Sequence, residues 1–201
     1  PPPPLDEIYA GSLHSPSSPP FHSVSSVARE LNGGPLGPLT HLVYSLSKDF
    51  SLSGLRAGCV YSENEEVNAC VQTVNDLCQV PSHTQQLLAA LLGDEAWVRE
   101  FLEENGRRVG SRYGRVAAAF AARGFPTLPS SHGLYSWVDL RSALRPGESE
   151  GDLHGRLVRD SGVAMTPGRS QGMPVDGFFR CVFTAVDDEG FEEVLRRIEM
   201  M

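Results

Sequence analysis

A long block of helical periodicity in the middle of the chain limits the folds that this sequence can adopt. Between residues 85 and 102, apolar side chains recur every three or four positions, with an interruption at Gly93, where Asp94 can cap a new helix. A further helix is predicted over residues 107–123. Four apolar residues should share one face of that helix: Val109, Tyr113, Val116 and Phe120.

Shorter elements are predicted on both sides of this block. Before it, turn-rich sequence separates a strand end within residues 5–10, a helix over 23–31, strands over 42–47 and 57–62, and a helix over 65–75. After it, the pattern predicts strands over 134–140, 163–165 and 178–184, a helix over 152–161, and a last helix capped by Asp187 or Asp188. This order predicts an α/β fold with two structural units.

Charge and cysteine usage exclude several classes of protein. A formal net charge of −8 argues against a nucleic-acid partner, which needs clustered cations. No run of about 18 apolar residues is present, so we expect no membrane partner. The four cysteines form no CxxC pair, and no histidine stands at ligand spacing from a cysteine pair. We therefore expect buried thiols in a reducing compartment, and no metal site.

The basic residues are strongly biased toward arginine. Of the 17 basic residues, only Lys48 is a lysine. An arginine stays protonated, whereas a lysine amine can lose its proton and form an imine. A chain with this bias would keep a lysine where an amine is chemically required. The alternative is a lysine that remains by chance on a solvated face.

The sequence around Lys48 carries groups that could bind a phosphate close to an imine-forming amine. Ser45 and Ser47 supply hydroxyls and Arg56 supplies a forked cation, all near a glycine-containing turn. Ser45-Leu-Ser-Lys48 also fits the S-x-x-K motif of penicillin-recognising serine enzymes, but the S-D-N and K-T-G motifs that should follow it are absent. A solvated turn without chemistry is the remaining alternative.

The chain resembles class I and II pyridoxal-phosphate (PLP) aminotransferases of fold type I. Within that family it is most similar to 1-aminocyclopropane-1-carboxylate synthases and their animal homologues. The resemblance rests on motifs that recur in the same order along nearly the whole chain: Asp6-Glu-Ile-Tyr-Ala10, Ser45-Leu-Ser-Lys-Asp49, Gly54-Leu-Arg-Ala-Gly58, Tyr61-Ser62, Leu134-Tyr-Ser-Trp-Val-Asp-Leu-Arg141, Thr166-Pro-Gly168 and Phe179-Arg180.

The resemblance implies a role for each of five residues toward a PLP cofactor. Lys48 would form the internal aldimine, a Schiff base with the cofactor, and then move the α-proton of the substrate. Asp6 would pair with the pyridinium nitrogen, and Tyr9 would donate to the phenolic oxygen. Ser45 and Arg56 would bind the phosphate.

The resemblance also implies that Arg180 binds the α-carboxylate of an amino-acid substrate. Alternation along the predicted strand places Phe179, Cys181 and Phe183 on one face and Arg180 on the other. A guanidinium among aromatic residues needs an anion or an acceptor. The structural alternative is a salt bridge from Arg180 to Asp187 or Asp188.

The family implies the domain organisation and the function that we expect. Residues 1–80 would be the remnant of a truncated PLP-binding large domain, 81–105 linking helices, and 106–201 an α/β small C-terminal domain. We expect the C-terminal part of a cytoplasmic, homodimeric, PLP-dependent enzyme that acts on α-amino acids, either a transaminase or a synthase-like lyase. The alternative is a catalytically silent or truncated homologue that binds PLP weakly or not at all.

Overall fold

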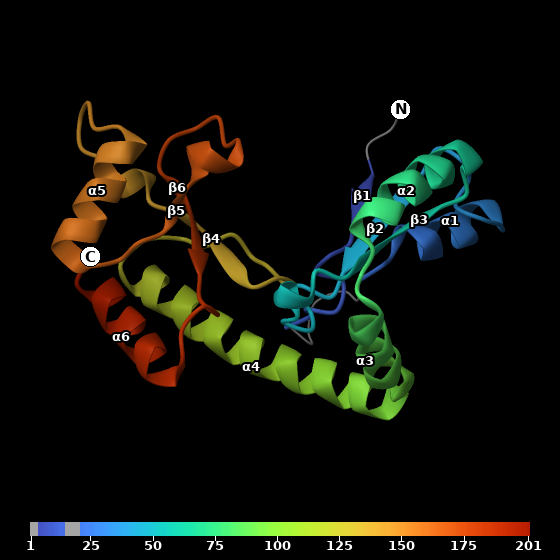
Figure 1. Ribbon diagram of the computed structural model, residues 1–201. Coiled ribbons are helices and arrows are strands. Elements are labelled where there is room, and N and C mark those ends of the chain that lie inside the picture. Colours follow the sequence, from blue (N-terminus) through green and yellow to red (C-terminus); the bar gives the residue numbers. More distant parts are fainter. Residues whose placement is uncertain (1–3, 15–20) are drawn as a thin grey trace. The chain divides into compact units, whose positions relative to one another are not determined.

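The computed structural model of the chain describes residues 4–14 and 21–201. Within it the chain forms two compact units, the first ending at Gly106 and the second spanning Arg107–Met201. Helix α4 (Glu95–Ala122) begins in the first unit and ends in the second (Figure 1). Each unit has its own sheet and its own apolar core.

The first unit contains a three-stranded sheet in the order β1-β2-β3. Its elements are β1 (Leu5–Asp6), α1 (Val24–Asn32), β2 (His41–Ser45), the 3-10 helix η1 (Ser53–Leu55), β3 (Gly58–Ser62), α2 (Glu65–Cys78), α3 (Ser82–Gly93) and the start of α4. Strand β1 runs parallel to β2, with Asp6 opposite Val43. Strand β3 runs antiparallel to β2, with Gly58 opposite Ser45.

The core of the first unit lies beneath the turn that follows β2. Leu46, Phe50 and Ala57 of this turn are buried together with Leu88 of α3. The ring of Phe50 stacks on Phe101 of α4 at 5.7 Å between centroids. The turn that carries Lys48 is therefore anchored by apolar side chains on both sides of the lysine.

The second unit contains a three-stranded antiparallel sheet in the order β4-β6-β5. Its elements are the end of α4, β4 (Tyr135–Asp139), η2 (Arg141–Ala143), α5 (Glu150–Ser161), β5 (Thr166–Pro167), η3 (Gly168–Gln171), β6 (Phe178–Val182) and α6 (Asp188–Glu199). Its core joins residues of α4, β4, α5, β6 and α6. The members that are completely buried are Val116, Phe120, Val138, Leu140, Leu153, Phe179 and Ile198.

Several local predictions are confirmed. Helix α1 is capped by Ser23 and ends at Gly33, which has the left-handed φ of 65° that a helix terminus of this kind requires. The face of α4 with Val109, Val116 and Phe120 is buried. Alternation in β6 is also confirmed, because Phe179 and Cys181 are buried.

Three expectations are wrong. The helices predicted over residues 85–102 and 107–123 are not separated near residue 106, because α4 continues through Gly106. Glycine has no Cβ, which lets the helix approach the carbonyl oxygen of Leu13 at this position. The strand expected over 163–165 is instead the short β5, Thr166–Pro167. Cys181 is buried as expected, but Cys59, Cys70 and Cys78 are exposed on surfaces of β3 and α2.

No helix within the described ranges is both long enough and apolar enough to cross a membrane.

Candidate functional site

The turn that carries Lys48 is closed by backbone hydrogen bonds at its base. Strand β2 ends at Ser45, and the amide of Leu46 donates to the carbonyl of Ala57 at 3.2 Å. The amide of Leu52 donates back to the carbonyl of Leu46 at 3.1 Å. Lys48 is half-buried at the top of this closed turn. Its backbone position is therefore fixed by hydrogen bonds and buried neighbours, while the residue keeps part of its surface exposed.

The structure brings Tyr9 close to Lys48. The Nζ atom of Lys48 lies over the Tyr9 ring, 6.0 Å from its centroid. The two residues come together because β1 pairs with β2, where the amide of Glu7 donates to the carbonyl of Val43 at 2.9 Å. Asp6 lies at the end of β1, exposed, and its carboxylate accepts from the amide of Ile8 at 3.0 Å.

Ser45, Ser47 and Arg56 line one hollow of about 620 Å³ beside β2, β3 and α2. The hydroxyl of Ser45 donates to the Ser47 hydroxyl at 2.7 Å and accepts from the Ser47 amide at 3.1 Å. The guanidinium of Arg56 donates to the carbonyl of Ser53 at 3.1 Å and is otherwise exposed. Two hydroxyls and one forked cation thus face a shared space, which is the donor set that a phosphate needs.

The backbone of Arg56 is strained. Its φ of 53° and ψ of 36° lie in the left-handed region, which a side chain with a Cβ occupies at a cost of about 1–2 kcal/mol. Within the described ranges, Ser51 is the other non-glycine residue with a positive φ, and it belongs to the same turn. Strain of this kind often marks positions where function rather than stability determines the conformation.

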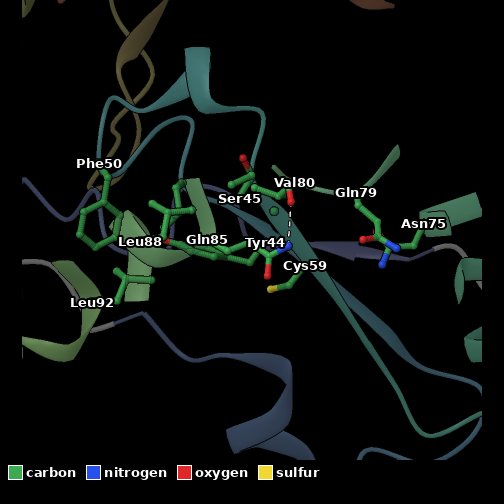
Figure 2. Close-up of a pocket in the computed structure, with 13 residues that line it drawn as sticks. Tyr44, Ser45, Phe50, Cys59, Asn75, Gln79, Val80, Gln85, Leu88 and Leu92 are labelled. Carbon is green, nitrogen blue, oxygen red and sulfur yellow. Dashed lines mark hydrogen bonds between the residues drawn. The ribbon is translucent and has the colours of Figure 1, made fainter. Parts of the chain in front are cut away.

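A second hollow of about 560 Å³ (Figure 2) shares several lining residues with the first, among them Tyr44, Ser45 and Cys59. Tyr44, Phe50, Leu88 and Leu92 give it a largely apolar wall, and the Gln85 side chain donates to the Val80 carbonyl at 2.7 Å. None of its lining residues carries a charged side chain. This hollow therefore offers an apolar surface with no charged group to bind a phosphate or a carboxylate.

Arg180 lies in the second unit, on the central strand β6. It is opposite Trp137 of β4 and Thr166 of β5. Its Nε atom is buried and has no hydrogen-bond partner among the described residues.

The alternative salt bridge of Arg180 is not formed. Asp188 pairs with Arg112 at 2.6 Å, and Asp187 caps α6 by accepting from the Gly190 amide at 2.8 Å.

Two buried carboxylates escaped the sequence reasoning. Asp49, next to Lys48, is fully buried, and Glu150 of α5 is 2% exposed. A lone acid beside a lysine is usually solvated, so the sequence alone gave no reason to place Asp49 inside. Its neighbour Phe50 is buried in the apolar core of the first unit, but a buried phenylalanine does not by itself indicate that the adjacent acid is buried. No group of three or more potential ligands suited to a metal ion occurs in the described part of the chain.

Residues 3–198 match the family described as Aminotransferase class I and II. The chain belongs to this family. The 1-aminocyclopropane-1-carboxylate synthase 11 of Arabidopsis thaliana is 38% identical over 196 residues, which are 96% of this chain and 42% of the relative. The corresponding synthase 1 of Prunus mume is 38% identical and covers 96% of this chain and 39% of the relative. The chain therefore spans about two fifths of the length of these relatives.

Solved structures agree with this assignment at the level of the fold. The aromatic aminotransferase of Pyrococcus horikoshii OT3 superposes with a TM-score of 0.80 at 24% identity, over 98% of this chain and 49% of that structure. Aspartate aminotransferase of Thermus thermophilus with maleate gives a TM-score of 0.79 at 23% identity, over 98% and 47%. The predicted α/β fold of the PLP-dependent transferases, fold type I, is confirmed. How residues 1–80, 81–105 and 106–201 divide between large and small domains stays a prediction.

Proposed function

We propose that this chain carries the cofactor-attachment lysine of a PLP-dependent enzyme that acts on α-amino acids. The observation that carries the proposal is the arrangement around Lys48, the single lysine of the sequence. Its amine lies 6.0 Å from the Tyr9 ring centroid, and Ser45, Ser47 and Arg56 line one hollow beside the same turn. Family membership supports the same assignment.

The residues present fit the functional groups of PLP. Its aldehyde needs a primary amine, which Lys48 supplies. Its phosphate dianion needs hydroxyl donors and a forked cation, which Ser45, Ser47 and Arg56 supply from one hollow. The strained backbone of Arg56 is consistent with a cation whose position matters more than local stability.

When bound, PLP would act as an electron sink for the negative charge left on the substrate α-carbon after proton removal. Lys48 would take up that proton, since its amine becomes free once the substrate amine replaces it. Asp6 would keep a positive charge on the pyridine nitrogen, and Tyr9 would donate a hydrogen bond to the phenolic oxygen. Arg180 would hold the substrate carboxylate in a two-bond fork.

The reaction type is proposed from the relatives. The 1-aminocyclopropane-1-carboxylate synthases favour a synthase-like lyase, while the aminotransferase structures favour a transaminase. Both reactions begin with α-proton removal, which is the step that Lys48 would perform. A homodimer and a cytoplasmic location stay predictions.

A labelling experiment tests the proposal. The purified protein is incubated with PLP, reduced with borohydride, and digested for mass spectrometry. We expect one modified peptide containing Lys48, and none in the Lys48→Arg variant, because a guanidinium cannot form the imine. Absence of label at Lys48 would remove the cofactor assignment.

The catalytically silent homologue is separated from the enzyme by a second measurement. An α-amino acid is added to the labelled but unreduced protein while the cofactor absorbance is followed. An enzyme shows a spectral change that saturates with amino-acid concentration. A silent or truncated homologue, which binds PLP weakly or not at all, gives no such change.

A further inference from the structure

The carboxylate of Asp49 lies at the centre of a buried hydrogen-bond cluster directly beside Lys48. Asp49 is 0% exposed. Its Oδ2 accepts from the Gly11 amide at 2.8 Å and from the Tyr44 hydroxyl at 2.9 Å, and its Oδ1 accepts from the Ser12 hydroxyl. A buried carboxylate is tolerated only when donors replace the water that it has lost, and here three donors do so.

Two of these donors belong to the segment that carries Tyr9. The amide of Ser12 donates to the Tyr9 carbonyl at 3.0 Å, so that Tyr9, Gly11 and Ser12 form one turn. A Cβ on Gly11 would lie 2.9 Å from the Asp49 carboxylate oxygen, closer than real Cβ atoms approach. Glycine at this position is therefore what lets the Tyr9 turn reach Asp49.

The third donor, Tyr44, connects the cluster to β2. Burial, together with the hydrogen bond to Asp49, raises the pKa of Tyr44 above its usual value, so the phenol stays protonated and remains a donor. The side chain of Asn105 on α4 donates to the backbone carbonyl of Asp49 at 3.3 Å. Donors from β2 and from the Tyr9 turn thus fix the Asp49 carboxylate, and the same hydrogen bonds fix the Tyr9 turn against it.

We propose that Asp49 is a positioning residue that fixes the Tyr9 turn against the Lys48 turn. Its carboxylate is buried among its three donors, so it would act through the placement of Tyr9 relative to the Lys48 amine and not by contact with PLP. The proposal deepens the proposed function and rests on it, because Tyr9 and Lys48 matter together only if both contact PLP. The alternative is that Asp49 stabilises the first unit without setting this geometry.

Two single hydroxyl deletions separate these alternatives. Ser12→Ala and Tyr44→Phe each remove one hydroxyl donor from the same carboxylate. Only Ser12 belongs to the Tyr9 turn, whereas Tyr44 belongs to β2. If Asp49 only stabilises the fold, the two variants should affect the Lys48–Tyr9 pair alike. If it positions the Tyr9 turn, Ser12→Ala should disturb that pair and Tyr44→Phe should not.

The single lysine makes the pair directly observable in the 201-residue chain. Reductive methylation with 13C-formaldehyde labels Lys48, and this modification keeps the positive charge of the amine. We expect an NOE between the labelled methyl groups and the Tyr9 ring, since Nζ lies 6.0 Å from the ring centroid. The expected result is loss of this NOE and of its ring-current shift in Ser12→Ala, and retention of both in Tyr44→Phe.

A third variant and melting curves distinguish a loss of the NOE caused by unfolding from a loss caused by a displaced Tyr9 turn. Asp49→Asn keeps an oxygen that can accept from Gly11, while its NH₂ can donate to the Ser12 oxygen, so the NOE should persist. Melting curves of all three variants show whether each retains its fold. Equal loss or equal retention of the NOE in folded Ser12→Ala and Tyr44→Phe would overturn the positioning role. Failure of PLP to label Lys48 in a wild-type protein with this NOE would overturn the proposed function instead.

Discussion

The guanidinium of Arg180 lies over the ring of Tyr135, with its central carbon 5.5 Å from the ring centroid. Such contact stabilises the cation, but it satisfies none of its N–H donors. The Nε atom is buried without an acceptor among the described residues, and an unsatisfied buried donor costs about 1–3 kcal/mol. The carboxylate of a bound substrate could satisfy this donor, which is the role proposed for Arg180.

Arg180→Lys should therefore weaken amino-acid binding while leaving PLP binding unchanged. An ammonium keeps the charge but loses the planar fork, and we expect a loss of about 1.5–3 kcal/mol, roughly tenfold to a hundredfold in dissociation constant. Titration of the cofactor absorbance with an α-amino acid measures this effect. Arg115→Lys, in an exposed pair with Glu192 in the same unit, is the matched control. Wild-type affinity in Arg180→Lys would return Arg180 to a structural role.

Arg56→Gly should separate stability from cofactor binding. Glycine adopts the left-handed conformation of residue 56 without the Cβ clash, so we expect stability against urea to be unchanged or raised by up to about 1 kcal/mol. The same change removes the cation beside Ser45 and Ser47, so PLP affinity should fall tenfold or more. Tryptophan fluorescence in urea and PLP titration measure the two effects. Arg99→Gly, on a helix, is the control that should lose stability without affecting PLP.

The fold was predictable from the sequence because the motifs occur in the order found in the family, and because the local signals for helices and strands agree with the elements that form. The cap pair Ser23 and Gly33 marks α1 at both ends, and the alternation in β6 buries Phe179 and Cys181. The break expected before residue 107 failed for a tertiary reason. A glycine such as Gly106 weakens an isolated helix. Here it lets α4 pack against the carbonyl of Leu13, and this contact between distant parts of the chain cannot be predicted from the local sequence.

The candidate site was predictable only in part. Residue types and order suggested Ser45, Lys48 and Arg56, and the structure places Ser45 and Arg56 along one hollow. The burial of Asp49 could not be foreseen, since its three donors come from segments more than thirty positions away or from the preceding strand. Hydrogen bonds of that kind follow from the completed fold and not from local spacing.

Glu150 should be a major stabilising residue of the second unit. Its buried carboxylate accepts from the Arg169 amide at 2.9 Å and from the Gly177 amide at 2.8 Å, which ties η3 to the start of β6. In Glu150→Gln one of these amides would face an NH₂ group, and we expect a loss of about 1–3 kcal/mol. Urea unfolding followed by Trp137 fluorescence, in a Trp97→Phe background, reports on this unit. The exposed Glu189→Gln is the control, and equal stability of the two variants would contradict the prediction.

The pair of Arg156 and Glu148 should make the second unit sensitive to acid. The guanidinium of Arg156 donates to both carboxylate oxygens of Glu148, at 2.8 and 2.9 Å. These bonds, with a further one from the Arg145 amide, lower the pKa of Glu148 from 4.5 to about 2. A carboxylate with a lowered pKa in the folded state contributes stability that is complete above its unfolded pKa and is lost as the pH falls through the folded value.

We therefore expect the urea midpoint of the second unit to be lower in Glu148→Gln than in the wild type at pH 6, with the gap closing as the pH falls from 4.5 toward 2. The gap closes because protonated Glu148 no longer accepts from Arg156 as a charged group. Glu193 also has its pKa lowered to about 2, by Arg196 and Arg197 on the exposed surface of α6. Glu193→Gln therefore tests the same pH range at a more solvated pair, where the gap should be smaller. A gap in Glu148→Gln that stays constant from pH 6 to pH 2 would show that its loss of stability comes from packing and not from the charge.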